Sequence, residues 1–354
     1  MKPEATAGPV PGATSTHGSR ARANLAWRDM VAPFEAPSLT RSLWQVASTL
    51  IPLAIAFYLM YRSLVLPYWI TLLLAIPTAG LTVRTFTIMH DCAHGSLFGQ
   101  RWANDLIGWC TGVLALTPYV QWRRDHVLHH ASSGDLTRRG HGDVWTLTVR
   151  EYQARSRLGK FRYRLFRHPV VLFGLGPLYL ALGQRWRGRG TATGAKEQAS
   201  VRETDLALVA LILGFSVLIG PLALVKIYVP VFMLAGASGI WLFYVQHQFE
   251  DTYWEEHAAW DYVSASIQGS SYYKLPAVLN WFTCNIGLHH VHHLSPRIPN
   301  YRLQACHRAN ARLQEATTIG LLQSRASVRL TLWDEETNRL VGWSAARTRT
   351  APAT

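Results

Sequence analysis

The sequence contains little cysteine. Four cysteines occur in 354 residues, and no two of them are spaced as CxxC. This scarcity excludes a small disulfide-stabilised scaffold and a zinc module built on thiolates. The chain also has no collagen-like G-X-Y period and no sustained charged heptad, so fibrous and long coiled-coil proteins are excluded as well. The cysteines are Cys92, Cys110, Cys284 and Cys306.

Charged side chains are scarce too. Asp, Glu, Lys and Arg make up 16% of the residues and apolar types 49%, whereas soluble domains carry roughly 25% charged residues. The few charges are unbalanced, with a formal net charge of +14 and a pI of about 10.0. The apolar content excludes an intrinsically disordered chain. Two classes remain, a nucleic-acid binder and a membrane protein with basic loops.

Four stretches of 19 or 20 residues contain no charged side chain, and each is long enough as a helix to cross the hydrocarbon core. The connections Arg62-Ser63 and Val225-Lys226 are too short to hold a domain, so we expect two transmembrane hairpins. Two shorter apolar runs, residues 106–118 and 170–182, are interpreted as helices at the membrane interface or buried in a cap. The four predicted spans are residues 43–61, 64–83, 206–224 and 227–245.

The position of the basic residues predicts the orientation. Of the 35 Lys and Arg residues, 31 lie in residues 1–42, 119–204 and 246–354, which two hairpins place on one side of the membrane. By the positive-inside rule, that side is the cytosol and contains both termini. The net charge then reflects topology, and no nucleic-acid partner is expected.

The predicted fold is an all-α integral membrane protein with four transmembrane helices in two hairpins and a cytosolic helical cap. The cap comprises residues 84–205 and 246–345, so that residues 41–345 form one domain. Residues 1–40 are expected to be a flexible cytosolic tail and residues 346–354 a C-terminal tail. Residues 185–200, rich in Gly, Arg and Thr, are expected to form a flexible link.

Histidine carries the functional signal. Eight of the 15 histidines fall into the three clusters HDCAH, HVLHH and HHVHH. Residues at i, i+3 and i+4 lie on one side of a helix, so each cluster can direct its imidazoles at a shared centre. His290, at i+1 in the third cluster, points elsewhere and is not expected to be a ligand. The eight are His90, His94, His126, His129, His130, His289, His292 and His293.

The three clusters lie in segments predicted on one membrane face, and His247 follows the fourth span by two residues on that same face. His247 is a candidate ninth ligand, and an interfacial histidine with a structural hydrogen bond is the alternative. Nine imidazoles are too many for one centre, so two metals are predicted, for which iron, copper or zinc would be suitable. The remaining histidines are interpreted as structural: His17, His141, His168, His257, His290 and His307.

At these residues the chain resembles the membrane fatty acid desaturases, whose signature is HxxxH, HxxHH and HxxHH. The likeness extends over roughly residues 40 to 340 and includes HDCAHGSLF, WLFYVQHQFEDTYW and GLHHVHHLSPRIPNYRL. Within the family, the chain is similar to the bacterial acyl-lipid desaturases of the Bacillus delta-5 and omega-6 type.

This resemblance implies a di-iron centre held by the clustered histidines in a protein of the bacterial inner membrane. It implies an oxidoreductase that acts on paired donors, uses O2 and two electrons, and introduces a cis double bond into a lipid-linked acyl chain. It also implies that the amide of Asn285, one turn before His289, holds a metal-bound water. Lipid hydroxylases and carotenoid ketolases have similar boxes and remain alternatives. A metal transporter is disfavoured, because the four spans contain no charge and no histidine.

The electron source is expected to be a separate protein. The chain has no HPGG haem segment, no cysteine set for an iron-sulfur cluster and no GxGxxG. A ferredoxin or similar small carrier is therefore expected to dock, and the basic segment 119–204 is the expected surface because such carriers are acidic.

Several residues beside the predicted ligands are candidates for orienting the imidazoles through their second ring nitrogen. These are Asp91, Asp125, Glu250 and Asp251, with helix capping or pairing with arginine as the alternative. Arg139, Gly140 and Gly142 in TRRGHGD are predicted either to bind a lipid phosphate or to shape a loop.

Overall fold

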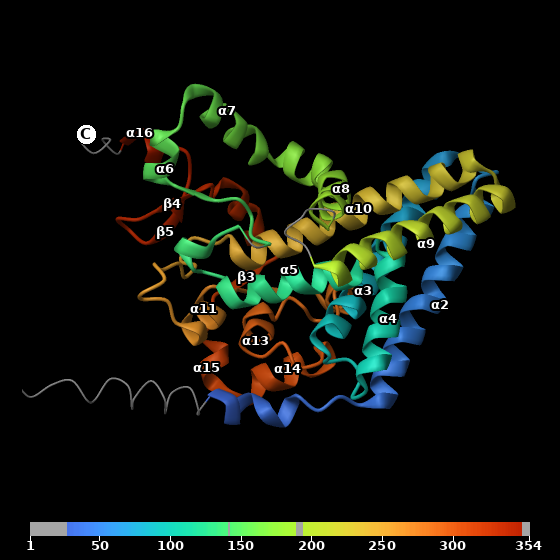
Figure 1. Cartoon of the computed structure of the whole chain (residues 1–354), viewed down its shortest axis with the longest axis horizontal. Coiled ribbons are helices and arrows are strands. Elements are labelled where there is room, and N and C mark those ends of the chain that lie inside the picture. Colours follow the sequence, from blue (N-terminus) through green and yellow to red (C-terminus); the bar gives the residue numbers. More distant parts are fainter. Residues whose placement is uncertain (1–26, 141, 189–193, 349–354) are drawn as a thin grey trace, which may run out of the picture.

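The computed structural model describes residues 27–140, 142–188 and 194–348. Within them the chain is mainly helical (Figure 1). Four helices of 25 or 27 residues form two antiparallel pairs that extend toward one end of the molecule. They are α2 (Leu39–Ser63), α3 (Tyr68–His94), α9 (Ala195–Ile219) and α10 (Pro221–His247).

Within the described residues, three helices are long and apolar enough to cross a membrane, namely α2, α3 and α10. A fourth span is possible if α7 (Arg157–Phe166) and residues 170–186, which are bent by 61° against each other, form one broken crossing. Large apolar side chains cover the outer surfaces of the long helices, and Val217 near the end of α9 is 90% exposed. Exposed apolar surface of this extent is typical of contact with lipid.

The turn between α9 and α10 differs from the predicted one. Gly220 has a φ of 86°, a left-handed conformation in which glycine commonly ends a helix, and Pro221 begins α10. The chain therefore turns at Gly220 and not at Val225-Lys226. Charged residues also explain why α9 is not among the three apolar spans, since Arg202, Glu203 and Asp205 interrupt its N-terminal half.

The first pair is close to its prediction. α2 includes all of residues 43–61, and α3 begins at Tyr68 after a turn that ends with Pro67. The interior between the pairs is apolar, and Met60 of α2, Ala79 of α3, and Val231 and Val245 of α10 belong to one buried cluster. One cation lies inside this region: Arg84 is 6% exposed, donates to Thr49 Oγ1 and to the carbonyl of Trp281, and lies 4.1 Å above the Trp281 ring.

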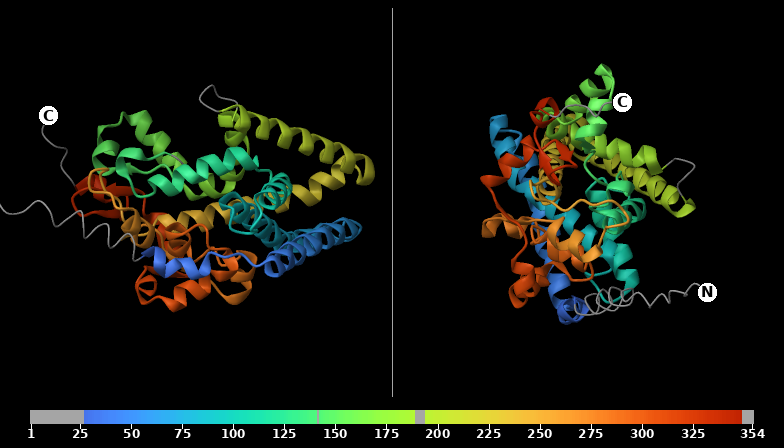
Figure 2. Two further views of the ribbon diagram at one scale, coloured as in Figure 1. Left: turned by 60° about the horizontal axis from the view of Figure 1, so that its bottom comes forward. Right: turned by 90° about the vertical axis from the view of Figure 1, so that its left-hand side faces the viewer.

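The rest of the molecule consists of shorter elements from distant parts of the chain (Figure 2). The helices there are α4 (Arg101–Leu114), α5 (Tyr119–Ser132), α6 (Val149–Ala154), α7, α8 (Gly176–Gly188), α11 (Tyr262–Gln268), α12 (Ala277–Phe282), α13 (His289–Leu294), α14 (Asn300–Ala309), α15 (Ala311–Gln314) and α16 (Ala345–Thr348). Shorter turns are η1 (Ala32–Phe34), η2 (Leu136–Arg138), η3 (Val170–Leu175) and η4 (Gln323–Arg329).

Two small sheets add to the predicted all-α fold. In the first, β1 (Leu147–Thr148) pairs in parallel with β4 (Leu332–Asp334), which pairs antiparallel with β5 (Arg339–Val341). In the second, β2 (Tyr272–Lys274) runs parallel to β3 (Thr318–Gly320), with Tyr273 opposite Ile319. The sheets fasten the C-terminal part of the chain to the segments that follow α5 and α11.

The predicted tails and link are shorter in the structure. Residues 27–31 are helical, and Val31 is buried against Val291 and Leu294 of α13. The expected N-terminal tail, residues 1–40, thus overlaps the folded part, and its first 26 residues lie outside the described ones. α16 (Ala345–Thr348) includes residues 346–348 of the expected C-terminal tail. In the expected link 185–200, α8 extends to Gly188 and α9 begins at Ala195, while residues 189–193 lie outside the described part.

Candidate metal centre

Four helices bring the nine predicted histidines together at the end of the molecule opposite the tips of the long pairs. α3 carries two of them in its last turn and stops at Gly95, whose φ of 67° ends the helix. α5 carries three, α10 ends with His247, and α13 carries three. All six residues of α13 are buried. The centre therefore depends on segments almost 200 residues apart in the chain.

The nine imidazoles form two groups, in each of which the candidate ligand atoms lie within 4.8 Å of one another. We call them the first and the second histidine group. The first consists of His90, His94, His126, His130 and His292. The second consists of His129, His247, His289 and His293.

The grouping differs from the expectation that each sequence cluster surrounds one centre. The HDCAH pair stays together, but α5 and α13 each contribute to both groups. On α5, the i and i+4 residues His126 and His130 belong to the first group and His129 to the second. On α13 the assignment is reversed, since the i and i+4 residues His289 and His293 belong to the second group and His292 to the first. Each helix thus contributes two histidines to one group and one to the other.

In both groups the Nε2 atoms face one another at short distances. In the first group, His130 Nε2 lies 3.1 Å from the Nε2 atoms of both His126 and His292. In the second group, His247 Nε2 lies 3.2 Å from that of His129 and 3.0 Å from that of His289. His293 Nε2 lies 3.1 Å from His289 Nε2.

The outer ring nitrogens of three histidines have acceptors that fix the tautomer. His129 Nδ1 lies 3.0 Å from Asp143 Oδ1, His247 Nδ1 3.1 Å from the carbonyl of Gly269, and His90 Nδ1 3.2 Å from Asp91 Oδ1. Because a carbonyl or a carboxylate only accepts, the proton of each neutral ring sits on Nδ1 and Nε2 carries a lone pair. This second-nitrogen contact is typical of metal-bound histidine.

Burial favours the neutral form of five of these imidazoles. Loss of hydration lowers the pKa of His126, His130, His289, His292 and His293 well below the usual value, and the neighbouring imidazoles lower it further. Neutral imidazole is the form that binds a metal. Trp122 stacks on His126 with ring centroids 4.2 Å apart and covers one side of the first group.

The donor set fits two metal ions. The Nε2 lone pairs of His129 and His247, which face each other at 3.2 Å, repel unless a cation lies between them. The buried Nε2 of His94 also has no hydrogen-bond partner among the described residues, which a metal would supply. Nitrogen donors of this kind suit first-row metals such as iron, copper and zinc.

The other histidines lie outside both groups as far as the structure describes them. His290 is fully buried and its Nε2 lies 3.2 Å from His307 Nδ1. His257 bonds to Asp135, and His168 lies on the surface next to α7. His17 and His141 fall outside the described residues.

The acidic residues predicted to orient the ligands have different roles. Asp91 does contact a ligand, and it also accepts from the backbone and side-chain amides of Asn300 at 2.8 and 2.7 Å. Asp125 accepts from Gln121 Nε2 at 3.1 Å. Glu250 and Asp251 pair instead with Arg339 at the surface.

Two partners of the second histidine group were not predicted, namely Asp143 and the Gly269 carbonyl. Asp143 ends the TRRGHGD segment, so a loop with several glycines that closes with a carboxylate was the available signal. Gly142 in that loop has a φ of 80°, and a Cβ there would lie 3.2 Å from the Cβ of His129. Arg139 binds Glu151 through both terminal nitrogens, at 2.7 and 3.0 Å. The segment therefore shapes a loop against His129, which is the second of its two predicted roles.

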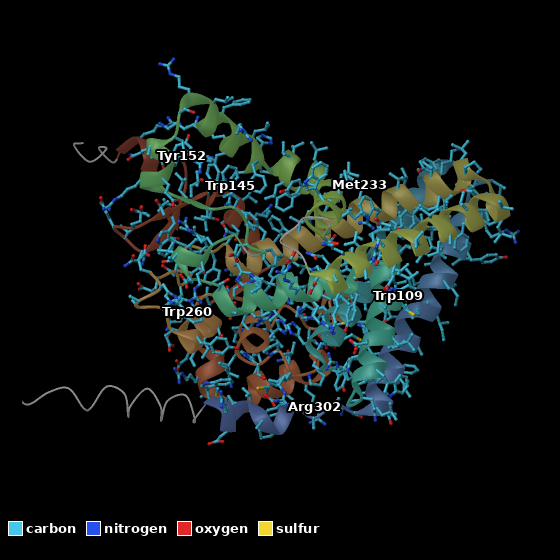
Figure 3. All side chains as sticks on the ribbon, in the orientation of Figure 1. Trp109, Trp145, Tyr152, Met233, Trp260 and Arg302 are labelled. Atoms are coloured by element: carbon cyan, nitrogen blue, oxygen red, sulfur yellow. The ribbon has the colours of Figure 1, made fainter. Side chains whose placement is uncertain are left out.

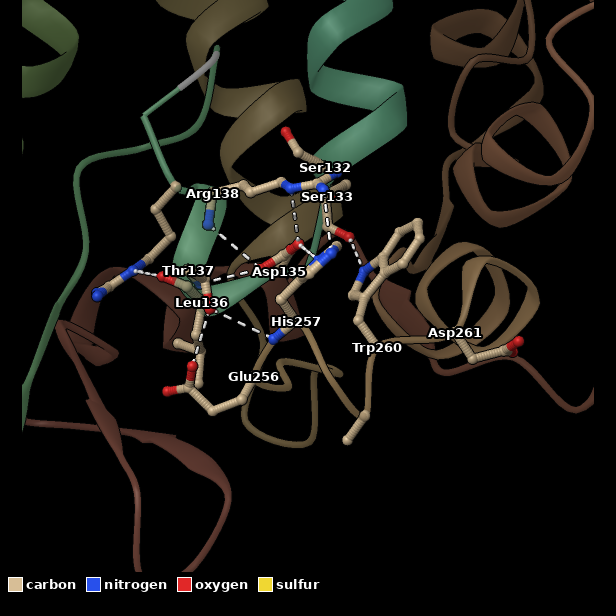
Figure 4. A network of polar contacts seen from close by, with 12 residues as sticks. Ser132, Ser133, Asp135, Leu136, Thr137, Arg138, Glu256, His257, Trp260 and Asp261 are labelled. Carbon is tan, nitrogen blue, oxygen red and sulfur yellow. Dashed lines mark hydrogen bonds and ion pairs between the residues drawn. The ribbon is translucent and has the colours of Figure 1, made fainter. Parts of the chain in front are cut away.

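A polar network anchors the end of α5 to the loop that precedes α11 (Figure 4). Asp135 is 1% exposed and accepts from His257 Nδ1 at 2.8 Å and from the backbone of Thr137 at 2.9 Å. Trp260 Nε1 donates to the Ser133 carbonyl at 3.0 Å. In α11, the Tyr262 hydroxyl donates to the His293 carbonyl at 2.7 Å. These contacts fix the α5 histidines relative to those of α13.

Comparison with known proteins identifies the family to which the chain is related. A model of the fatty acid desaturase family matches residues 63–321. A fatty acid desaturase of Bacillus subtilis (strain 168) is 44% identical over 318 residues, which cover 90% of each chain. An sn-1 oleoyl-lipid 12-desaturase of Synechocystis is 24% identical over 303 residues, covering 84% of this chain and 85% of the relative. An sn-1 acyl-lipid omega-3 desaturase (ferredoxin) of Nostoc sp. is 27% identical over 229 residues, covering 62% and 61%. The resemblance noted in the sequence is confirmed.

Proposed function

This chain belongs to the fatty acid desaturase family, and we propose on that premise that it introduces a cis double bond into a lipid-linked acyl chain, using O2 and two electrons. The observation that carries the proposal is the pair of adjacent histidine groups, with five and four imidazoles. We propose that each group holds one iron ion. When bound, such a di-iron centre supplies O2 chemistry strong enough to remove hydrogen from an unactivated methylene.

The residues of the chain bind and orient the centre and protect it from water. Asp143 and the Gly269 carbonyl hold the rings of His129 and His247 with Nε2 directed inward, and Asp91 does the same for His90. The second group is buried throughout, which excludes bulk water from that side. This role of the protein requires no nucleophile and no acid-base pair.

Asn285 is proposed to offer its side-chain amide to a water at the centre. The residue has a φ of 57°, and its backbone N–H donates to the Asn280 carbonyl at 3.0 Å. Its side chain makes no hydrogen bond with another described residue, so the amide is free to bind water. Replacement by alanine should alter the spectrum of the iron-loaded protein without loss of iron. Unchanged spectra in Asn285→Ala would contradict this role.

The substrate is proposed to be an acyl chain carried by a membrane lipid. The names of two relatives, an sn-1 oleoyl-lipid desaturase and an sn-1 acyl-lipid desaturase, support this choice. The membrane location of the long apolar helices supports it as well, because a chain in the bilayer reaches the protein without leaving the lipid. Hydroxylation or ketolation by the same centre would differ in product and is the alternative.

The membrane is proposed to be the bacterial inner membrane, with both termini and the histidine groups in the cytosol. The distribution of basic residues supports this orientation. It predicts that Val65→Cys, in the turn between α2 and α3, reacts with an impermeant maleimide in spheroplasts. Arg155→Cys at the other end should react only after lysis. The opposite labelling pattern would contradict the orientation.

A small acidic carrier such as a ferredoxin is proposed to supply the electrons. One relative carries "ferredoxin" in its name. The segment around α6 and α7 presents Arg155, Arg157 and other basic side chains on its surface, where an acidic carrier would be attracted.

Expression in a bacterial host that makes saturated and monounsaturated lipids tests the function. We expect new double bonds, located by mass spectrometry of derivatised fatty acids. A product that is heavier by one oxygen would favour the hydroxylase alternative. The absence of any new fatty acid from iron-loaded protein supplied with a competent carrier would contradict desaturation.

A further inference from the structure

A cavity of about 290 Å³ lies where α7 bends toward η3. None of the nine histidines lines it. It is formed by the end of α7, by η4 and by the segment that leads into α16. Its volume is just below the usual range for ligand pockets, roughly 300 to 1,000 Å³. The residues around it are Arg164, Arg167, His168, Pro169, Val328, Trp343 and Arg347.

Arg167 is a buried cation that pairs with no anionic side chain among the described residues. It is 2% exposed, and its terminal nitrogens donate only to neutral acceptors. Its Nε is buried and has no hydrogen-bond partner in the described part of the chain. A buried charge is normally paired, so an anion in the cavity would lower the free energy of this arrangement. The acceptors are the Trp145 and Leu330 carbonyls, Thr146 Oγ1, Tyr244 Oη and Gln248 Oε1.

Two more guanidinium groups line the cavity, those of Arg164 and Arg347. Neither forms an ion pair with a carboxylate of the described residues. Arg164 lies 5.5 Å above the ring of Trp343 and 5.7 Å above that of Tyr152, so aromatic contacts hold it at the rim. Figure 3 shows Trp145 and Tyr152 on the α7 side of the molecule, beside this rim. Planar guanidinium groups bind phosphate through paired hydrogen bonds, which makes a phosphate the anion that best fits three of them.

The surroundings of the cavity have the character of a membrane surface. On α7, exposed Leu158 and Phe161 alternate with basic side chains, as in helices that lie at an interface. Beyond the cavity, η3 and α8 expose Val170, Leu175 and Leu182. The same segment packs on α10, where the Phe173 ring lies 5.2 Å from that of Trp241. The cavity thus lies where the basic surface meets the exposed apolar surface.

We propose that this cavity binds the phosphate of an anionic membrane phospholipid, with the acyl chains lying along η3 and α8. This binding goes beyond the desaturation reaction and does not depend on the metal centre. Free inorganic phosphate shares the binding chemistry but lacks the chains, so the apolar surface beside the cavity favours the lipid.

Binding of phosphatidylglycerol to the full chain in neutral detergent, measured by native mass spectrometry, tests the proposal. The test variant is Arg164→Gln with Arg347→Gln, and both side chains are exposed, so the fold should survive. The matched control is Arg157→Gln with Arg162→Gln. It also removes two positive charges, but both come from α7 residues that do not line the cavity. Because Arg164 and Arg347 line the cavity and the control pair does not, affinity should fall roughly tenfold or more in the test variant and less than about twofold in the control.

A second variant tests the cavity without a change of charge. Val328→Trp would fill the space from η4, and we expect a similar loss of phosphatidylglycerol affinity. Diacylglycerol with the same chains should bind the unmodified protein much more weakly. Equal losses in the test and control arginine variants would overturn the proposal, because they would indicate general surface attraction. Complete displacement of the lipid by an equal concentration of inorganic phosphate would overturn it as well.

Discussion

The imidazoles of His129 and His247 face each other through their Nε2 atoms at 3.2 Å, and both rings hold their Nδ1 proton toward another acceptor. Asp143 accepts from one and the Gly269 carbonyl from the other. Two lone pairs so close together repel in the neutral state. A cation between the two Nε2 atoms would remove this repulsion, so the second histidine group could hold a metal ion.

Removal of one member of this pair should abolish the reaction. In His129→Ala the second group loses a ligand, and the Asp143 carboxylate loses its partner. We expect no new unsaturated fatty acid in the bacterial host. His290→Ala should retain the product, because His290 contacts His307 outside both groups. Product per amount of purified protein is the measurement, and equal loss in both variants would refute the grouping.

Asp143 should control metal affinity without being a ligand. In Asp143→Asn an amide oxygen can still accept the His129 proton, but the negative charge that strengthens the imidazole as a donor is lost. Changes of this kind cost roughly 10- to 100-fold in metal affinity. Retention of iron against a chelator measures it. Asp251→Asn is the control, since that carboxylate is 61% exposed and pairs with Arg339. The iron affinity of this variant should be unchanged.

The glycines of the same loop separate a backbone effect from an effect on the metal. Gly140 and Gly142 both have positive φ values, of 104° and 80°. Alanine at either position should destabilise the fold by about 1–2 kcal/mol. Only at Gly142 would the new Cβ contact His129, since nothing lies within 4 Å at Gly140. Gly142→Ala should therefore lose iron as well as thermal stability, and Gly140→Ala stability alone. Identical iron contents would show that the contact is unimportant.

Electron delivery should depend on the basic surface near α7. Arg155→Glu with Arg157→Glu should slow reduction by an acidic carrier about tenfold at low salt and weaken the dependence on ionic strength. Stopped-flow reduction of the iron-loaded protein measures both. The control reverses two charges at the tips of the long helix pairs, Arg62→Glu with Lys226→Glu, and should leave the rate unchanged. A similar slowing in both double variants would place the carrier elsewhere.

The sequence predicted the nine histidines because helical spacing and position relative to the apolar stretches are local properties. It did not predict how they divide between two centres. That division depends on how α5 and α13 face each other. On α5, His129 joins the second group while its neighbours join the first, and on α13, His292 joins the first group while its neighbours join the second. Facing of this kind is a tertiary property that no spacing within one helix specifies.

Other differences have similar causes. The turn at Gly220 has a local signal, since a Gly-Pro pair marks a break, whereas the predicted turn at Val225-Lys226 rested on the two uncharged stretches that flank it. The Gly269 carbonyl as an acceptor for His247 had no signal, because any residue type supplies a carbonyl. Val31 packs against α13 although it lies close to a segment poor in apolar residues. Such contacts are determined by tertiary packing.

The metal content of the purified chain tests the central claim most directly. The two histidine groups predict two iron ions per chain in protein prepared from iron-supplied cells, and about one per chain in His247→Ala, whose second group keeps three imidazoles. Elemental analysis against protein concentration gives both numbers. A single metal per chain in the unmodified protein, or iron unchanged in His247→Ala, would contradict the account.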